Sequence, residues 1–177
     1  SETGAPAALS GVMMRPIDGK NGIFNSIQML EAIRPKDARH SPRSALVSIE
    51  NTANFGGGTI WPIKQLRSVS NAAHKAGLKC HMDGARLFNA VIASGTPASK
   101  YGQSVDSLWI DLSKGLGCPI GAVLVGDKEF IEEAFRFKHQ FGGAMRQSGI
   151  IAAAGIFALQ NNLDRLEEDH ENAQYLG

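Results

Sequence analysis

The stretch LKCHMDGARLFNA, residues 78–90, decides the fold, because an apolar strand pattern gives way to a helical one within a few residues. LKCHM at 78–82 has the length and apolar character of a buried strand. Residues 86–94 then have the composition of a helix. A strand that leads directly into a helix is typical of α/β proteins, in which helices cross over between parallel strands.

The same alternation of helix and strand continues upstream of this stretch. Residues 24–34 are predicted to form a helix, because their large apolar residues recur at helical spacing. These apolar residues are Ile27, Leu30 and Ile33. The next run, ALVSI at 45–49, has the length and composition of a β-strand.

A second helix is predicted between these two strands. It begins at Pro62, because proline is favoured in the first turn of a helix, and it ends at Gly77. Its predicted buried face consists of Leu66, Val69 and Ala73.

Downstream of residue 94, the sequence predicts two further strands and two further helices. The strands cover 107–112 and 120–125, and the helices cover 129–141 and 147–169. The whole pattern predicts an α/β fold with a mostly parallel sheet and flanking helices. Ligands of such sheets bind at the carboxyl ends of the strands, where Glu50, Asp83 and Lys114 stand.

Composition limits the possible classes of function. The chain has 177 residues, of which 43% are hydrophobic and 20% charged, as in one ordinary globular domain. The net charge is +1, and the basic residues are scattered among acidic ones, so they form no basic stripe that would bind nucleic acid. No apolar run is long enough to span a membrane. Cys80 and Cys118 form no metal or disulfide framework, and the first residues lack a secretory pattern. We expect a cytoplasmic protein with no nucleic-acid or membrane partner.

Lys114 has the position of a reactive amine. A lysine at a strand end in a dry crevice can form a Schiff base, because desolvation favours the neutral amine over the ammonium. Ser113 and Gly115 on either side allow the backbone to approach a cofactor closely. From its position alone, Lys114 is better explained as a solvated loop residue, because most lysines are solvated.

Asp83 follows the strand at 78–82 directly. A carboxylate there needs a cationic partner to offset its burial, and a protonated pyridine nitrogen would supply one. An alternative is that Asp83 caps the helix that begins near Ala85. That capping role does not require Arg86, which lies one turn further on.

Four separated motifs carry a resemblance to a known family. In chain order they are ENT at 50–52, HMDGARLFNA at 81–90, LSKGLGCPIGAVLVG at 112–126 and GGAMRQSGIIAAAG at 142–155. Together they resemble the low-specificity threonine aldolases, which are pyridoxal-phosphate enzymes with the aspartate-aminotransferase fold. The resemblance implies that residues 1–146 form part of the large, cofactor-binding domain. It also implies that residues 147–177 form a helix leading towards a smaller C-terminal domain.

The resemblance also implies roles for five residues. Lys114 would bind pyridoxal 5'-phosphate covalently, and Asp83 would pair with the pyridinium nitrogen of the cofactor. Arg86 would hold the substrate α-carboxylate, for which its planar fork of donors is suited. His40 would lie near the substrate β-hydroxyl, and Arg146 would bind the cofactor phosphate across a subunit interface. Without the resemblance, His40 is a loop histidine and Arg146 a surface charge.

The implied reaction is retro-aldol cleavage of L-threonine or L-allo-threonine, both β-hydroxy-α-amino acids, to glycine and acetaldehyde. The implied assembly is a homo-oligomer, either a dimer or a tetramer. The chain departs from the family pattern at Ala53 and Asn54, where a histidine is common, and at Asp111, where cysteine is usual. Asp111 adds a carboxylate close to Lys114, and a charged Lys114 is the wrong state for attack.

The family's chains are much longer than this sequence. The resemblance therefore implies that the phosphate-binding turn and the small domain lie outside these residues, and we expect little aldolase activity from residues 1–177 alone. Two alternatives stay open. One is a non-catalytic chain that acts as a binding or assembly partner, and the other is a related pyridoxal-phosphate enzyme such as a β-eliminating lyase or an aminotransferase.

Overall fold

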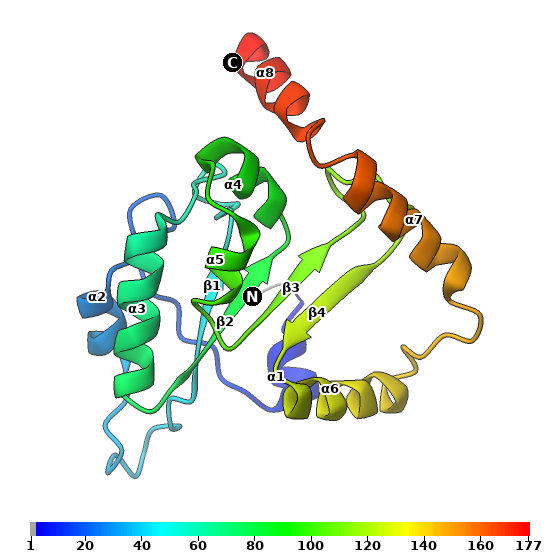
Figure 1. Ribbon diagram of the computed structural model, residues 1–177. Coiled ribbons are helices and arrows are strands. Elements are labelled where there is room, and N and C mark those ends of the chain that lie inside the picture. Colours follow the sequence, from blue (N-terminus) through cyan, green and yellow to red (C-terminus); the bar gives the residue numbers. More distant parts are fainter. Residues whose placement is uncertain (1–2) are drawn as a thin grey trace.

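Within residues 3–177, which the computed structural model describes, four strands form a sheet in the order β1-β2-β3-β4 (Figure 1). The strands are β1 (Leu46–Glu50), β2 (Lys79–Gly84), β3 (Ser107–Asp111) and β4 (Ala122–Gly126). The first three are parallel, and β4 runs antiparallel to β3. The predicted α/β fold with a mostly parallel sheet is confirmed.

Eight helices accompany the strands in the described part of the chain (Figure 1). They are α1 (Ala5–Ser10), α2 (Ser26–Ala32), α3 (Ile63–Lys75), α4 (Leu87–Ser94), α5 (Ala98–Gly102), α6 (Lys128–Gln140), α7 (Gly149–Asn161) and α8 (Leu166–Leu176). Helix α3 connects β1 to β2, and α4 with α5 connects β2 to β3. No helix among residues 3–177 combines the length and apolar character that crossing a bilayer requires.

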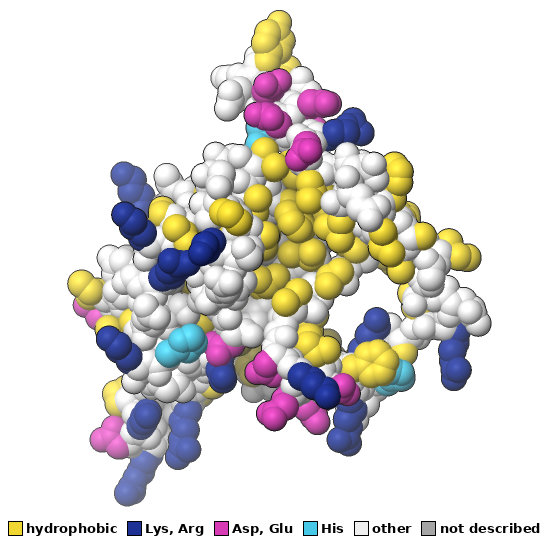
Figure 2. Space-filling view, viewed as in Figure 1, with side chains coloured by type: hydrophobic (Ala, Val, Ile, Leu, Met, Phe, Trp, Pro, Cys, Tyr) yellow, Lys and Arg dark blue, Asp and Glu magenta, His cyan; other side chains and the backbone are white. Residues whose placement is uncertain are grey.

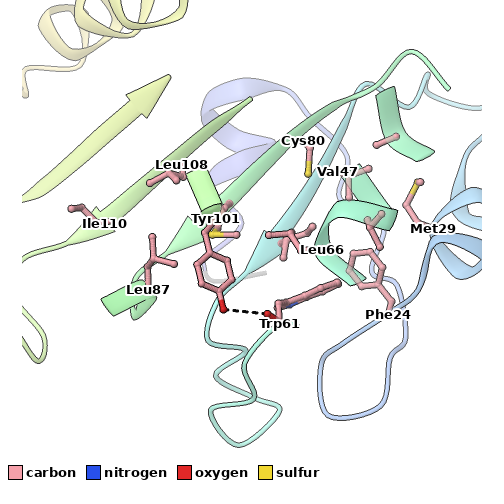
Figure 3. Packing of buried hydrophobic residues seen from close by; sticks show 14 of the residues in the cluster. Phe24, Met29, Val47, Trp61, Leu66, Cys80, Leu87, Tyr101, Leu108 and Ile110 are labelled. Atoms are coloured by element: carbon pink, nitrogen blue, oxygen red, sulfur yellow. Dashed lines mark hydrogen bonds between the residues drawn. The ribbon is translucent and has the colours of Figure 1, made fainter. Parts of the chain in front are cut away.

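The core lies between the first three strands and helices α3 to α5 (Figure 3). Buried residues alternate with more exposed ones along β1, β2 and β3, so one face of the sheet packs against these helices. Trp61 lies near the centre of the core, where its ring meets the Phe24 ring edge-on at 4.9 Å between centroids. The predicted buried face of α3 is confirmed, since it consists of Leu66, Val69 and Ala73.

The buried face of α2 differs from the prediction. Ile27 and Leu30 are exposed, whereas Met29 is buried. The helix begins with a capping box, in which the side chains of Asn25 and Gln28 each bond the other's backbone N–H. Because α2 has only seven residues, this cap and the packing against α3 leave a single buried position in it.

The helix predicted over 147–169 is observed as two helices, α7 and α8. After α7, the Asn162 side-chain amide donates to the Leu116 carbonyl at 2.8 Å, which ties the chain to the loop after β3. Helix α8 begins at Leu166, which is buried against Gly115. These two anchors explain why the helix is interrupted.

Asp106 ties β2 to β3 at the amino end of the sheet. Its carboxylate accepts hydrogen bonds from His74 Nε2 at 2.7 Å, from Lys79 Nζ at 3.0 Å and from the Cys80 backbone N–H at 2.8 Å. Partial burial opposes ionisation of this carboxyl, but the hydrogen bonds outweigh it and lower the pKa of Asp106 to about 2. Asp106 is therefore an ionised carboxylate that joins the strands at the end of the sheet opposite to the carboxyl ends of β1 to β3.

Candidate active site

Asp83 lies at the carboxyl end of β2, between two register partners. Glu50 of β1 pairs with it on one side and Trp109 of β3 on the other. Register partners in a sheet point to the same face, so these three side chains lie together on the face that α3 to α5 leave uncovered.

The Asp83 carboxylate is only partly engaged. Its Oδ1 accepts a hydrogen bond from the Ala85 backbone N–H at 3.0 Å, and Oδ2 accepts none of the hydrogen bonds formed within residues 3–177. Helix α4 begins at Leu87 with Arg86 as its N-cap, so the alternative that Asp83 caps this helix is wrong. One oxygen of Asp83 is therefore open to a ligand.

Lys114 lies three residues beyond the end of β3. Its Nζ donates to Asp111 Oδ2 at 2.5 Å and lies 5.6 Å from the centroid of the Trp109 ring. Because Trp109 is the register partner of Asp83, the amine above the Trp109 ring and the Asp83 carboxylate lie at the same edge of the sheet. The Lys114 side chain is 40% exposed, so it is both paired and accessible.

Asp111 holds Lys114 from a fixed position. Its Oδ1 accepts from both the backbone N–H and the hydroxyl of Ser113, at 2.8 Å and 2.6 Å. Burial opposes ionisation, but the hydrogen bonds from Lys114 and Ser113 outweigh it and lower the pKa of Asp111. The Asp111 side chain that contacts Lys114 is therefore an ionised carboxylate at neutral pH.

Arg86 lies between the Lys114 loop and a larger cavity. It lines a small cavity together with Asp111 and Gly115. It also lines a cavity of about 680 Å³ between the loop after β1, α4 and α8. Asn89 and His170 line the larger cavity and approach each other at 3.2 Å. A guanidinium in this position can bind a carboxylate through two donors.

His40 and Arg146 do not lie at this edge of the sheet. His40 is exposed on the segment between α2 and β1, which runs at the amino end of the sheet (Figure 1). Arg146 is exposed on the segment between α6 and α7, which extends away from β3 (Figure 1). Within one chain, neither residue is brought to Lys114.

Sequence reasoning did not single out Trp109 as part of this site. The signal was present in the alternation of β3, because Trp109 and Asp111 are two residues apart and therefore share a face. The pairing of Asn89 with His170 carried no such signal, since it joins α4 to α8 across 81 positions of sequence.

The family model for beta-eliminating lyases matches residues 1–177. The chain belongs to the beta-eliminating lyase family. It is 43% identical to the low specificity L-threonine aldolase of Escherichia coli K12 over 176 residues, which cover 99% of this chain and 52% of that protein. It is 41% identical to the probable low-specificity L-threonine aldolase 2 of Arabidopsis thaliana, over 99% of this chain and 50% of that protein. This beta-eliminating lyase chain thus spans about half the length of these curated relatives.

Another curated relative of this beta-eliminating lyase chain has a different name. The alanine racemase TOXG of Cochliobolus carbonum is 39% identical over 163 residues, which cover 91% of this chain and 41% of that protein.

Solved structures agree on the fold. The crystal structure of a putative L-allo-threonine aldolase from Listeria monocytogenes superposes with a TM-score of 0.83, at 23% identity, over 99% of this chain and 46% of that one. The threonine aldolase of Leishmania major superposes with a TM-score of 0.76, at 21% identity, over 93% of this chain and 48% of that one. These superpositions confirm the predicted aspartate-aminotransferase-like fold.

Proposed function

We propose that this chain is part of a pyridoxal-phosphate-dependent lyase that cleaves L-threonine or L-allo-threonine to glycine and acetaldehyde. The observation that carries the proposal is the register of β2 and β3. It sets Asp83 beside Trp109, and the Lys114 amine lies 5.6 Å from the centroid of that ring, which supports a shared role for the two residues. The names of the curated relatives from Escherichia coli and Arabidopsis thaliana support this substrate class.

The residues at this edge fit a pyridoxal-type cofactor. Lys114 supplies an accessible primary amine for an aldehyde, and Asp83 has an open carboxylate oxygen for a protonated ring nitrogen. When bound, pyridoxal phosphate supplies an electron sink for the pair released from the broken carbon–carbon bond. Asp83 supports that role by keeping the ring nitrogen protonated.

Arg86 is proposed to bind the substrate α-carboxylate. Its place beside the cavity of about 680 Å³ leaves room for an amino acid next to the Lys114 loop. Fixing the carboxylate also fixes which bond at Cα is aligned for cleavage, so Arg86 would select the reaction as well as the substrate.

His40 and Arg146 are proposed to act in a homo-oligomer. His40, or a water that it orients, would accept the β-hydroxyl proton, and Arg146 would bind the cofactor phosphate. Both are exposed and distant from Lys114 in a single chain, so both roles require a second copy of the chain. Residues 1–146 would then belong to the large domain, and residues 147–177 would lead towards a smaller one.

The test is to identify the products from L-threonine and L-allo-threonine. Residues 1–177 are assayed alone and as a chimera in which they replace the matching segment of the Escherichia coli aldolase. We expect equal amounts of glycine and acetaldehyde from the chimera, and a loss of at least about a hundredfold in Lys114→Ala. Ammonia with 2-oxobutanoate would contradict the proposal and indicate β-elimination. D-alanine formed from L-alanine would indicate a racemase, as the similarity to the alanine racemase TOXG allows.

A further inference from the structure

The Lys114 loop, residues 112–121 between β3 and β4, lies against α7 and the start of α8 (Figure 1). We propose that Asn162, at the corner between these two helices, is a positioning residue that fixes the loop and thereby holds the Lys114 amine beside Trp109. Helices α7 and α8 would then form part of the candidate active site. The inference rests on the proposed role of Lys114 in binding the cofactor.

The Asn162 side chain completes the hydrogen bonding of the loop from outside. Inside the loop, the Gly117 N–H donates to the Lys114 carbonyl and the Cys118 N–H donates to the Leu112 carbonyl, both at 2.9 Å. The Leu116 carbonyl instead accepts from Asn162 Nδ2, at 2.8 Å and across 46 positions of sequence. Because a backbone carbonyl that leaves solvent needs a donor, loss of this amide would leave the loop without that bond and free to open.

Packing contacts from the same two helices lie on both sides of Lys114. Leu166, the first residue of α8, is 1% exposed, and a Cβ added at Gly115 would lie 2.6 Å from its Cδ2. On α7, the Ala154 carbonyl accepts from Cys118 Sγ at 3.5 Å. The backbone at position 114 is therefore fixed by its neighbours, which contact α7 and α8, while its own side chain points to the edge of the sheet.

The position of this backbone determines where the amine lies. The Lys114 side chain is 40% exposed and long, so packing restrains it little. Its Nζ lies 5.6 Å from the centroid of the Trp109 ring, beside the strand that carries Asp83. Displacement of a reacting group by about 1 Å can cost about a hundredfold in rate. Asn162 contacts the loop and not the amine, so its effect on Lys114 would be transmitted through the loop backbone.

Hydrogen exchange tests this effect without any cofactor. In Asn162→Ala, exchange of the Gly117 and Cys118 amides, measured by NMR, should be about three- to tenfold faster than in the wild type. Asn162→Asp keeps the size of the side chain and loses the donor, so it serves as a second variant if circular dichroism shows that Asn162→Ala does not fold.

The chain contains a matched control in the preceding residue. Asn161 Nδ2 also donates to a backbone carbonyl at 2.8 Å, but to Phe157 within α7, so Asn161→Ala should leave the two loop amides unchanged. Val69→Ala, at a fully buried site in α3, controls for a general loss of stability and should also leave them unchanged. Equal acceleration of these amides by Val69→Ala and Asn162→Ala would overturn the inference.

Trapping of pyridoxal phosphate tests the consequence for Lys114. After borohydride reduction, the ratio of pyridoxyl groups on Lys114 to those on the exposed Lys64 of α3 should fall about three- to tenfold in Asn162→Ala and stay unchanged in Asn161→Ala. An unchanged ratio, or unchanged exchange of the loop amides, in a folded Asn162 variant overturns the inference. A wild-type chain that carries the group on another lysine would instead overturn the proposed function, and the exchange rates would still decide whether Asn162 fixes the loop.

Discussion

Replacing Gly84 by alanine tests whether β2 and β3 must approach closely beside the candidate site. The added Cβ would lie 2.5 Å from the Trp109 carbonyl oxygen and 3.3 Å from Leu87 Cβ. The oxygen belongs to the backbone of the neighbouring strand and cannot rotate away. An ordinary carbon–oxygen contact of about 3.3 Å therefore requires the strands to separate by about 0.8 Å.

The expected effect of Gly84→Ala is a loss of about 1–3 kcal/mol in the free energy of unfolding, which is typical of overpacking. Urea unfolding followed by circular dichroism measures it. With a slope near 2 kcal/mol per molar, the midpoint should fall by about 0.5–1.5 M. Because Trp109 packs beside Lys114, the same change should disturb the candidate site.

Gly102→Ala is the matched control. Gly102 lies in α5, and an added Cβ would meet only Leu108 Cδ2 at an ordinary 3.6 Å. This variant should be neutral or more stable by up to about 1 kcal/mol, because alanine loses less backbone entropy than glycine in a helix. A Gly84→Ala chain as stable as the wild type would refute the close approach of β2 and β3 as the reason for this glycine.

Two substitutions and one chemical modification test the packing of the core and the hydrogen bonds of Asp106. Asp106→Asn should lower the free energy of unfolding at pH 7 by about 1–2 kcal/mol, after allowance for partial exposure. The pKa of Asp106 is about 2 in the folded chain, below its ordinary value. The stability difference between wild type and Asp106→Asn is therefore fully present above about pH 4 and disappears as the pH falls through 2. A stability difference that does not change with pH would contradict this prediction. Leu66 is fully buried, so Leu66→Ala should lower the free energy of unfolding by about 2–5 kcal/mol. Equal urea midpoints for Leu66→Ala and the wild type would contradict this prediction. Burial raises the pKa of the Cys80 thiol to about 11, so iodoacetamide at pH 8 should modify Cys80 only in unfolded chains. Prompt modification of Cys80 in the folded protein would contradict this prediction.

Much of the fold could be predicted because strands and long helices leave different periodicities in the sequence. The thirteen residues of α3 span more than three turns, so Leu66, Val69 and Ala73 define its buried face clearly. Helix α5 has five residues and α2 has seven, which is too short for periodicity to define a face. In α2, the cap at Asn25 and the contact with α3 determine that Met29 is buried.

The candidate site could be predicted in part. Asp83 and Lys114 were expected at neighbouring strand ends. The register of β2 and β3 places Asp83 beside Trp109, and Lys114 lies over that ring from the loop after β3. The sequence also indicated a carboxylate near Lys114, but the direct contact of Asp111 depends on the loop geometry after β3. The roles of His40 and Arg146 stay predictions, because patterns within one chain contain no information about the arrangement of several copies.

The most direct test of the proposed function is to locate the amine that binds pyridoxal phosphate. The chain is incubated with one equivalent of pyridoxal phosphate, reduced with borohydride and digested, and the modified lysine is identified by mass spectrometry. We predict that the pyridoxyl group lies on Lys114, in large excess over the exposed Lys64, and that Lys114→Ala abolishes this excess without a new preferred lysine. Modification of Lys114 no greater than that of Lys64, or a preference for any other lysine, would contradict the proposal.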